Sequence, residues 1–425
     1  MTEAAVPSGE FPSTEPESSA FGKLTVLMVT AFIDMLGLLM ILPLLPFYAK
    51  NLGGGGLIVG FLVSAFSLAQ LVSAPIWGRF SDKHGRRPAL MVGLAASAIA
   101  YLVFAYADSL WLLFLSRIVQ GAGGGTVSVI QAYVADATKP DDRAKSLGWL
   151  SAATNAGVAI GPAIGSGLSA WGPHAPGLVA AALCVVNIIF ASQYLTEIRK
   201  PKASEASGEP EKRKSSREAV LRVVSHPDEP ASRLVLIYAI AIGAFQGTTA
   251  ILALFLAYRF GVTAKTIGYF FMYIGTLSVI VRALFLGKLV DRFGEPKLSR
   301  WGLLFLAAGL IGMALSHDFV SLVIAVGLLP LGTAFTFPCV TAMLSRVVSS
   351  SERGLYMGVQ QTYGGITRIA FPVILGAAFD SVLGKPSPFV ISASMVLMTL
   401  LLGKDLERYA PRKTMEQKVP SGVTK

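Results

Sequence analysis

Two charged residues, Asp34 and Arg117, lie deep inside long apolar stretches of the sequence and are the first candidates for chemistry. A charge in the hydrocarbon region of a membrane is costly unless it is paired or hydrated, so such residues mark functional sites. Asp34 stands about ten residues into the first stretch, roughly 15 Å along a helix and near the middle of a bilayer. Arg117 lies at a comparable depth in the fourth stretch. We predict that Asp34 takes up and releases protons with Arg117 as its electrostatic partner; a static buried pair is the alternative.

Two further arginines fall within apolar stretches, Arg282 and Arg368. Arg282 lies about five residues from the end of its stretch, so its long side chain can extend to the membrane surface. Arg368 lies too deep for this and must face protein or a water-filled cavity. With Arg117 and Arg368 against Asp34, the deep region is slightly cationic. This charge suits anionic or zwitterionic substrates as well as lipophilic cations.

Several polar residues in these stretches suit the wall of a cavity that binds a small molecule. Each of them is also of a type that forms hydrogen bonds between membrane helices, which is the simpler interpretation for any single one. The candidates for the substrate cavity are Gln120, Tyr133, Asn155, Gln246, Gln361 and Arg368.

The elements that position these residues are apolar helices. The chain has 425 residues, of which 53% are hydrophobic and only 14% charged, with a mean hydropathy of +0.61. Soluble proteins carry about 25% charged residues, so this chain has too few to cover a water-facing surface. Each stretch is long enough to cross a bilayer as a helix. The predicted fold is an all-α membrane protein of twelve transmembrane helices in two pseudo-symmetric six-helix bundles.

The net charge of +11 reflects where the basic residues lie rather than a nucleic-acid partner. If the N-terminus is cytoplasmic, most of the Lys and Arg residues fall in cytoplasmic loops, as the positive-inside rule requires. We therefore predict a multi-pass protein of the inner (plasma) membrane with both termini in the cytoplasm. Its partners are the lipid bilayer, a small-molecule substrate and protons, with no nucleic acid.

The scattered cysteines and histidines give no reason to expect a catalytic or metal site. Cys184 and Cys339 lie in different apolar stretches, and the four histidines form no cluster with metal-ligand spacing. We predict no metal, no cofactor and no enzymatic activity.

A repeated pattern divides the chain into two related halves. Gly78 to Gly85 recurs from Gly287 to Gly294 at an offset of 209, and Pro162 recurs as Pro372 at an offset of 210. Internal repeats of six spans build carriers in which two bundles rock about a central site. The predicted segments are a disordered cytoplasmic N-terminus (1–20), the first bundle (21–195), a cytoplasmic linker (196–232), the second bundle (233–403) and a cytoplasmic tail (404–425). The polar, charged linker is read as a solvated connection, with a regulatory or partner-binding loop as the alternative.

A short run between the second and third stretches combines glycines, an acid and arginines. The residues of this gating motif are Gly78, Asp82, Gly85, Arg86 and Arg87, with Asp291 as the repeat of Asp82. The glycines permit a tight turn and close helix approach. Asp82 can accept hydrogen bonds from the positive N-terminus of a helix in the other half, near Gly354, and so latch the cytoplasmic side. Simple positive-inside anchoring is the alternative, but it explains neither acid.

The glycines of the fifth stretch, Gly157, Gly161 and Gly165, are spaced four residues apart on one helix face. Small residues there allow a neighbouring helix to approach closely, and Pro162 can bend the span. Tight packing alone explains the pattern, and a face that shears or seals during transport explains it too.

Three of these motifs resemble those of the major facilitator superfamily. The run from Gly78 to Pro88 resembles its signature, Arg117 to Gly123 its arginine motif, and Gly157 to Gly165 the motif of its proton antiporters. The likeness covers about residues 24–403. Asp34 to Gly37 and Ala132 to Asp136 are similar to the twelve-helix drug/proton antiporters that include tetracycline pumps. Those pumps carry an acid in the third span where this chain has Ala100, which counts against tetracycline specificity and against a relay of two carboxylates in the first half.

This resemblance implies a secondary active transporter that works as a monomer and exports small amphiphilic compounds, such as drugs, in exchange for protons. An organic-anion or metabolite carrier, working as a symporter or exchanger on the same fold, is the alternative. A membrane receptor or channel that does not transport is a third possibility, although it has no need for the two-fold repeat of Asp82 and Asp291.

Overall fold

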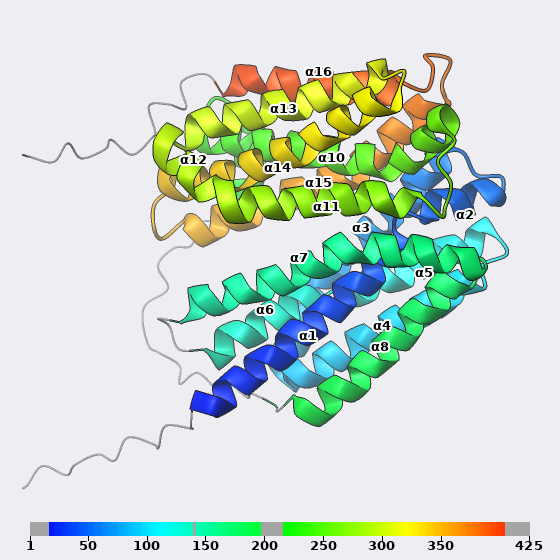
Figure 1. Cartoon of the computed structure of the whole chain (residues 1–425). Helices are drawn as coiled ribbons and strands as arrows, with labels where there is room; N and C mark the ends of the chain where they lie inside the picture. The colour runs from blue at the N-terminus through cyan, green and yellow to red at the C-terminus, as the bar shows by residue number, and fades with distance from the viewer. Residues whose placement is uncertain (1–16, 139–141, 196, 198–215, 404–425) are drawn as a thin grey trace, which may run out of the picture.

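A computed structural model of the chain describes residues 17–138, 142–195, 197 and 216–403, and all regular structure among them is helical (Figure 1). The first half, here the N bundle, consists of α1 (Glu17–Ile41), α2 (Leu45–Asn51), α3 (Gly56–His84), α4 (Arg86–Ala105), α5 (Leu110–Gly123), α6 (Thr126–Ala137), α7 (Arg143–Leu168) and α8 (Ala175–Tyr194). The second half, the C bundle, consists of α10 (Pro230–Phe260), α11 (Ile267–Ile280), a π-helical turn (Val281–Phe285), α12 (Leu286–Phe293), α13 (Glu295–Leu315), α14 (Phe319–Val347), α15 (Arg353–Asp380) and α16 (Ser387–Leu402).

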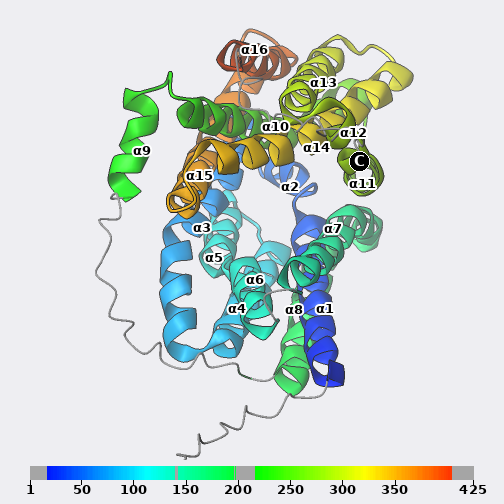
Figure 2. The same cartoon turned by 90° about the vertical axis from the view of Figure 1, so that its left-hand side faces the viewer.

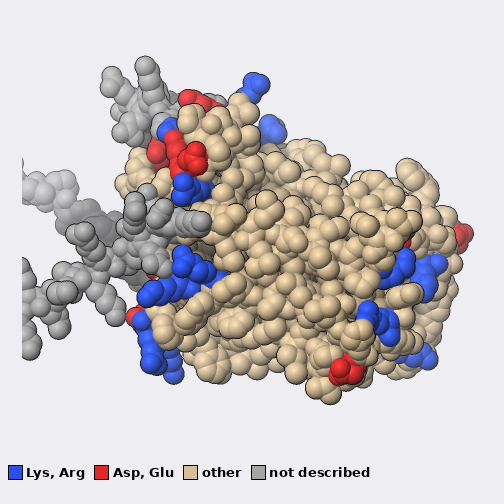
Figure 3. Space-filling view, turned by 90° about the horizontal axis from the view of Figure 1, so that it is seen from above, with Lys and Arg blue, Asp and Glu red and all other residues tan. Residues whose placement is uncertain are grey.

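Twelve spans result when the helices that continue one another are joined. Ten of the spans in the described part of the chain are long and apolar enough to cross a membrane. The other two are α7, which carries Ser151, Thr154 and Asn155, and α16, which has only 16 residues. Figure 3 shows the result on the face of the C bundle: charged residues gather at the two ends, and a band with almost no charge separates them. Such a band is the surface that a bilayer covers.

The two bundles face each other along two pairs of helices. α3 packs on α15 and α11 packs on α7, so that the second and fifth spans of each bundle form the interface (Figure 2). The helices of the two bundles converge at one end of the molecule and diverge at the other, where α1 begins and α16 ends (Figure 1). We call this second end the terminus side and the other end the opposite side.

Each bundle has an ion pair at the equivalent position, but the acidic and basic residues have exchanged places between the two bundles. In the N bundle Arg86 Nε lies 3.1 Å from Asp136 Oδ2, and in the C bundle Arg346 pairs with Glu295. Arg86 and Glu295 are 209 positions apart, and Asp136 and Arg346 are 210 apart, the offsets of the sequence repeat. Each pair ties the start of the third span of a bundle to the end of its fourth. Pseudo-symmetry thus preserves the ion pair and not the identity of its members.

Exchanging the charges of the C-bundle pair gives a direct test of this equivalence. Glu295→Arg alone places two cations together and should lower the free energy of unfolding by about 1–3 kcal/mol, between the values for exposed and buried pairs. Adding Arg346→Glu recreates the orientation found in the N bundle and should restore most of the loss. Thermal unfolding in detergent measures both variants. A double variant as unstable as the single one would contradict the equivalence.

The predicted linker contains a helix that is attached to the C bundle. α9 (Ser216–Ser225) buries Val223, and the hydroxyl of Tyr363 on α15 donates a hydrogen bond of 2.9 Å to the carbonyl of Val220. One face of α9, with Val223, is therefore packed on the C bundle, while residues such as Glu218 and Leu221 on the same helix are exposed.

The helix ends differ slightly from the predicted segment boundaries. α1 begins at Glu17 and α10 at Pro230, a few residues before the predicted starts of the two bundles at 21 and 233. The disorder predicted for the first residues and the tail predicted at 404–425 fall outside the described residues, apart from 17–20.

Candidate functional site

The fourth span is broken in its middle, and the polar residues of the site lie on the two sides of the break. α5 ends at Gly123 and α6 begins at Thr126 because four of the five residues from Gly121 to Gly125 are glycine, which weakens a helix. The break leaves Arg117 and Gln120 in the last turns of α5 and Thr126 in the first turn of α6. Interrupted spans at mid-membrane are typical of substrate and ion sites in transporters.

Asp34 of α1 lies in the interior of the N bundle beside this break, with only 5% of its surface exposed. Its carboxylate accepts a hydrogen bond of 2.8 Å from the hydroxyl of Thr126. It lines a cavity of about 30 Å³ together with Tyr101 and Gln120, and the Gln120 amide donates a 2.8 Å hydrogen bond to the Tyr101 hydroxyl. A cavity of this size holds one water molecule. The carboxylate is therefore screened from bulk water and from lipid.

Arg117, the predicted electrostatic partner of Asp34, is also buried, with 1% of its surface exposed. No ion pair joins the two side chains among the described residues. The Arg117 guanidinium carbon lies 5.5 Å from the centre of the Phe104 ring, and its Nη2 atom has no hydrogen-bond partner. The two charges are therefore not in direct contact, although both act electrostatically on Tyr101.

A cavity of about 270 Å³ lies between the bundles and receives side chains from both. Arg117, Gln70 and Phe66 line it from the N bundle, and Gln246 and Arg368 line it from the C bundle. Arg368 Nε, like Arg117 Nη2, is buried without a hydrogen-bond partner. The predicted cavity residues Gln246 and Arg368 thus meet at one site, where Arg117 joins them.

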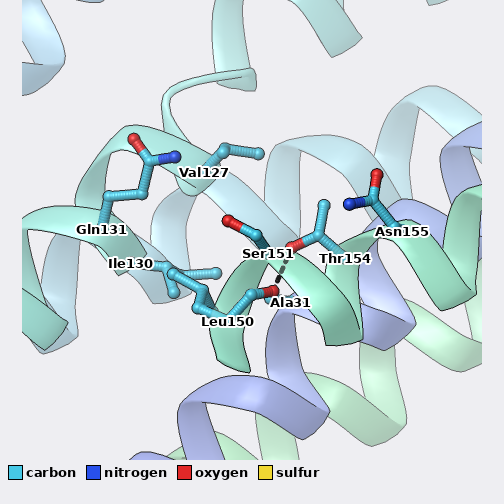
Figure 4. A pocket seen from close by; sticks show the side chains of 8 residues that line it. All are labelled: Ala31, Val127, Ile130, Gln131, Leu150, Ser151, Thr154 and Asn155. Atoms are coloured by element: carbon cyan, nitrogen blue, oxygen red, sulfur yellow. Dashed lines mark hydrogen bonds between the residues drawn. The ribbon is translucent and has the colours of Figure 1, made fainter. Parts of the chain in front are cut away.

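A second cavity, of about 120 Å³, lies within the N bundle between α1, α6 and α7. Figure 4 shows Gln131 of α6 on one side of it and Ser151 and Asn155 of α7 on the other. Thr154 lines it as well, and its hydroxyl donates a hydrogen bond of 2.8 Å to the carbonyl of Leu150. The wall carries no charge and combines these four polar side chains with apolar ones such as Val127 and Ile130, so it can bind water or a neutral group with polar and apolar parts.

The remaining candidates for the substrate cavity lie elsewhere. Gln120 lines the small cavity beside Asp34 rather than the one between the bundles. Tyr133 is fully buried in the apolar core of the N bundle, among residues such as Leu90, and does not line either of the larger cavities. Gln361 is exposed and does not line them either.

The gating motif forms a tight turn on the terminus side. Gly85 has φ +104°, and a Cβ atom there would overlap the carboxylate of Glu197. This carboxylate accepts hydrogen bonds from the backbone N–H groups of Arg86 (2.8 Å) and Arg87 (3.1 Å), the first residues of α4. Glu197 therefore caps α4, and only glycine at position 85 leaves room for it.

The predicted latch between Asp82 and the C bundle is not formed in this conformation. The side chain of Asp82 is 66% exposed and pairs at 2.9 Å with Arg86 one turn later, in its own bundle. Its repeat Asp291 is exposed as well. No described atom lies within 4 Å of where a Cβ atom on Gly78 or Gly354 would be. The close approach that these glycines permit is therefore absent on the terminus side.

The antiporter motif joins helices within the N bundle. A Cβ atom on Gly157 or Gly161 would lie 2.6 or 2.8 Å from a carbonyl oxygen of α1, and one on Gly165 would overlap the carbonyl of Met40. The glycine face of α7 is thus packed on α1 backbone, whereas Pro162 of the same helix faces the C bundle.

On the opposite side, two equivalent contacts seal the bundles together. The carbonyl of Pro372 on α15 occupies the place of a Cβ atom on Gly60 of α3. In the same way the carbonyl of Pro162 on α7 abuts Gly268 of α11, whose N–H donates a 2.7 Å hydrogen bond to the hydroxyl of Ser166. Each contact joins a glycine of the second span of one bundle to the proline of the fifth span of the other. We call the two contacts the glycine–proline seal.

A carboxylate closes the same side from the end of α15. Asp380 accepts hydrogen bonds from the N–H groups of Gly56 (3.0 Å) and Leu57 (2.8 Å), the first residues of α3. The residue before α3 is Gly55, which has no side chain to cap the helix, so Asp380 caps it from the other bundle. Sequence reasoning missed this contact, whose only local signs are the glycines that precede α3 and the acid that ends α15.

Removing the Asp380 carboxylate should weaken the closed opposite side. Asp380→Ala removes a charged helix cap worth about 1–2 kcal/mol, so the equilibrium should shift about 5- to 30-fold toward opening of that side. A cysteine in place of Ser67, which lines the 270 Å³ cavity, reports opening through its reaction with a membrane-impermeant maleimide. Asp318→Ala is the matched control because Asp318 caps α14 within its own bundle, where its carboxylate accepts a 2.9 Å hydrogen bond from Ser321. Equal labelling of both variants would show that the cap does not join the bundles.

Comparison with known proteins agrees with this architecture. The chain matches the Major Facilitator Superfamily over residues 27–294 and 234–425. It is 26% identical to multidrug resistance protein 2 of Bacillus subtilis (strain 168) over 376 residues, 88% of this chain and 92% of that protein. It is 29% identical to the class G tetracycline resistance protein of Vibrio anguillarum over 378 residues, 87% and 93% of the two chains.

Solved structures share the fold at lower sequence identity. The human organic anion transporter MFSD10 (TETRAN) superposes with a TM-score of 0.65 and 22% identity, covering 92% of this chain and 100% of that one. The nucleoside transporter NupG gives a TM-score of 0.70 at 14% identity, covering 91% of this chain and 98% of that one. Two related bundles, a cavity between them and a sequence match over both halves lead to one conclusion: the chain belongs to the Major Facilitator Superfamily.

Proposed function

We propose that this protein is a secondary active transporter that exports small amphiphilic organic compounds in exchange for protons. The observation that carries the proposal is a screened carboxylate, Asp34, next to a cavity that both bundles line. A carboxyl group in the membrane interior can couple a proton to a change of conformation, because burial and hydration affect its charged form differently. The relatives named for multidrug and tetracycline resistance support export as the direction.

The terminus side is proposed to face the cytoplasm, in the inner (plasma) membrane, with the chain working as a monomer. The excess of Lys and Arg in the loops assigned to that side supports this orientation. The opposite side, with its glycine–proline seal and the Asp380 cap, then faces outward. The described conformation is accordingly closed to the outside and ready to receive substrate from the cytoplasm.

Transport then proceeds by alternating access between two conformations. Substrate enters from the cytoplasmic side while Asp34 is ionised. Separation of Gly60 from Pro372 and of Gly268 from Pro162 opens the outer side, while Asp82 moves to the N-terminus of α15 and closes the inner one. Substrate leaves, Asp34 takes up a proton from outside, and the bundles return.

An organic-anion or metabolite carrier is the second candidate function. The two arginines that line the cavity between the bundles, Arg117 and Arg368, favour it because each has a buried nitrogen without a partner. The fold is the same for both candidates. They differ in the charge of the substrate and in the direction of its exchange with protons.

Purified protein in vesicles with an imposed pH difference tests the proposed function. Labelled compounds should accumulate in vesicles that are acidic inside, and adding an exported compound should release protons from them, as read by an entrapped pH dye. Accumulation that needs an alkaline interior would establish symport and reject exchange. Accumulation of no compound under either gradient would reject proton-driven transport.

A further inference from the structure

We propose that the substrate is a zwitterionic amphiphile whose anionic group binds between Arg117 of the N bundle and Arg368 of the C bundle. The inference deepens the proposed function, on which it rests for the direction in which protons and substrate exchange. It assigns a charge pattern to the ligand of the 270 Å³ cavity.

The first argument is the unbalanced positive charge of this cavity. Arg117 is almost fully buried with a free Nη2, and Arg368 has a buried, free Nε. No carboxylate belongs to the described residues that line the cavity. A buried cation is stable only when an opposite charge and hydrogen bonds compensate it. A guanidinium is a planar fork of donors that matches a carboxylate, so two of them define an anion site.

The second argument is the apolar wall beside the two arginines. Leu38 and Leu42 of α1 and Phe66 of α3 line the same cavity. Pockets for drug-sized ligands have about 300–1,000 Å³, so this one accepts a ligand with one or two aromatic rings in the present conformation. The cavity therefore fits an anionic group attached to a compact apolar body.

The third argument concerns the sign of the coupling to protons. The cavity of Asp34 and the cavity of the two arginines share Leu38, Phe66 and Gln70 as walls. Protonation of Asp34 removes a negative charge near the anion site, so a pure anion and a proton would favour each other's binding. Exchange requires that the proton and the substrate weaken each other's binding, because the carrier must bind them in turn.

A positively charged group on the same ligand makes the binding of substrate and proton mutually exclusive. Directed toward the shared wall, it is attracted by the ionised Asp34 carboxylate and competes with the proton for it. A ligand with both charges therefore fits the two arginines and still exchanges for protons. A lipophilic cation would meet two unpaired arginines, and a pure anion would bind together with the proton.

Three related naphthyl compounds test the charge pattern: naphthylalanine is a zwitterion, naphthylethylamine lacks its carboxylate, and naphthylpropionate lacks its amine. We expect naphthylalanine to bind the purified protein about tenfold or more tightly than naphthylethylamine, as one charged hydrogen-bonded contact supplies. Lowering the pH from about 8 to about 6 should weaken naphthylalanine binding and strengthen naphthylpropionate binding, because both ligands keep their charges in this range.

The ionisable side chains around Asp34 do not compete with it as the source of this pH effect. Among the described residues they are the phenol of Tyr101 on α4 and the thiol of Cys184 on α8, together with the guanidinium of Arg117 on α5, which acts on Tyr101. A buried phenol and a buried thiol stay neutral over this range of pH, and a guanidinium stays charged. In Asp34→Asn both pH effects should therefore disappear.

Two arginine variants separate the anion site from a general effect of charge. Arg368→Gln should weaken the binding of naphthylalanine and naphthylpropionate, the two carboxylates, about tenfold or more. It should leave the affinity for naphthylethylamine unchanged or increase it. Arg282→Gln is the matched control, since Arg282 also lies in a span but is exposed and away from the cavity. Equal effects of both variants would overturn the proposal. So would tightest binding of the amine, equal binding of all three compounds, or binding of none.

Failure of this inference is distinguishable from failure of the proposed function. If vesicles exchange other compounds for protons while the naphthyl series shows no preference for a carboxylate, the function stands and the zwitterion site is wrong. If naphthylalanine binds with dependence on Arg368 but no compound exchanges for protons, the anion site stands and the proposed function is wrong.

Discussion

Replacing Asp34 by asparagine is expected to abolish proton-driven transport while the protein still folds and reaches the membrane. An amide has nearly the shape of the carboxyl group and can keep the hydrogen bond from Thr126, but it has no proton to exchange. For one-to-one exchange, a pH difference of about two units supports at most about a 100-fold accumulation, since each unit is a factor of ten. The variant should lose this whole ratio and only equilibrate the compound across the vesicle membrane.

Asp108→Asn is the control for this experiment, because Asp108 lies exposed between α4 and α5 and the substitution is chemically the same. It should accumulate substrate like the wild type. Substrate counterflow, which needs no proton, should persist in Asp34→Asn and show that binding and conformational exchange survive. Proton-driven accumulation by Asp34→Asn at the level of the wild type would show that another group carries the proton.

Gly60→Ala is expected to have the second largest effect, by preventing closure of the opposite side. The added methyl group would overlap the Pro372 carbonyl, which belongs to the backbone of α15 and not to a flexible side chain. Overpacking of this kind costs about 1–3 kcal/mol, and here it acts only on the conformation in which the seal is closed. The equilibrium should therefore shift roughly 5- to 150-fold toward the conformation that is open on the opposite side.

The reporter for Gly60→Ala is again a cysteine in place of Ser67, labelled from the opposite side with an impermeant maleimide. Gly167→Ala is the matched control, because Gly167 lies on the same side and a Cβ atom there would meet nothing within 4 Å. Transport should fall in Gly60→Ala together with the rise in labelling. Unchanged labelling would mean that α3 and α15 can separate slightly at no cost, and the seal would then not control access.

The architecture followed from the sequence because its signals are local and repeated. Long apolar runs predict the spans, the offset of about 210 predicts two bundles, and one acid in an apolar run predicts a buried Asp34. The break in the fourth span was missed although four glycines in five residues indicate it. The apolar length of the stretch predicts an unbroken span, whereas the low helix propensity of glycine predicts the break.

The composition of the cavity was less predictable. A membrane helix is apolar on all sides, so periodicity does not reveal which face of it meets the centre of the protein. Tyr133 and Arg368 looked alike as polar residues in apolar spans, yet the first is packed in the core and the second lines the cavity. Only the rotation of each helix about its own axis separates them.

Contacts between the bundles were the hardest to predict because they depend on the conformation. In the described conformation the partner of Asp82 is the neighbouring Arg86 of its own bundle, not a residue of the C bundle. The Asp380 cap joins residues 324 positions apart, and backbone N–H groups, which every sequence supplies, are its donors. Neither contact can be predicted from a pattern in the amino-acid sequence.

The glycine–proline seal also limits how the two bundles can turn against each other for as long as it stays closed. Gly60 with Pro372 and Gly268 with Pro162 are two separate points of contact, and two points define a line. A rigid body that keeps both points in place has a single freedom left, rotation about that line. The terminus side can therefore widen or narrow by rotation of one bundle about this line. The displacement is large at the far ends of the helices and almost zero at the line itself. Glycine is needed at positions 60 and 268 because the backbones of the two bundles are in direct contact there and must stay in contact during the rotation.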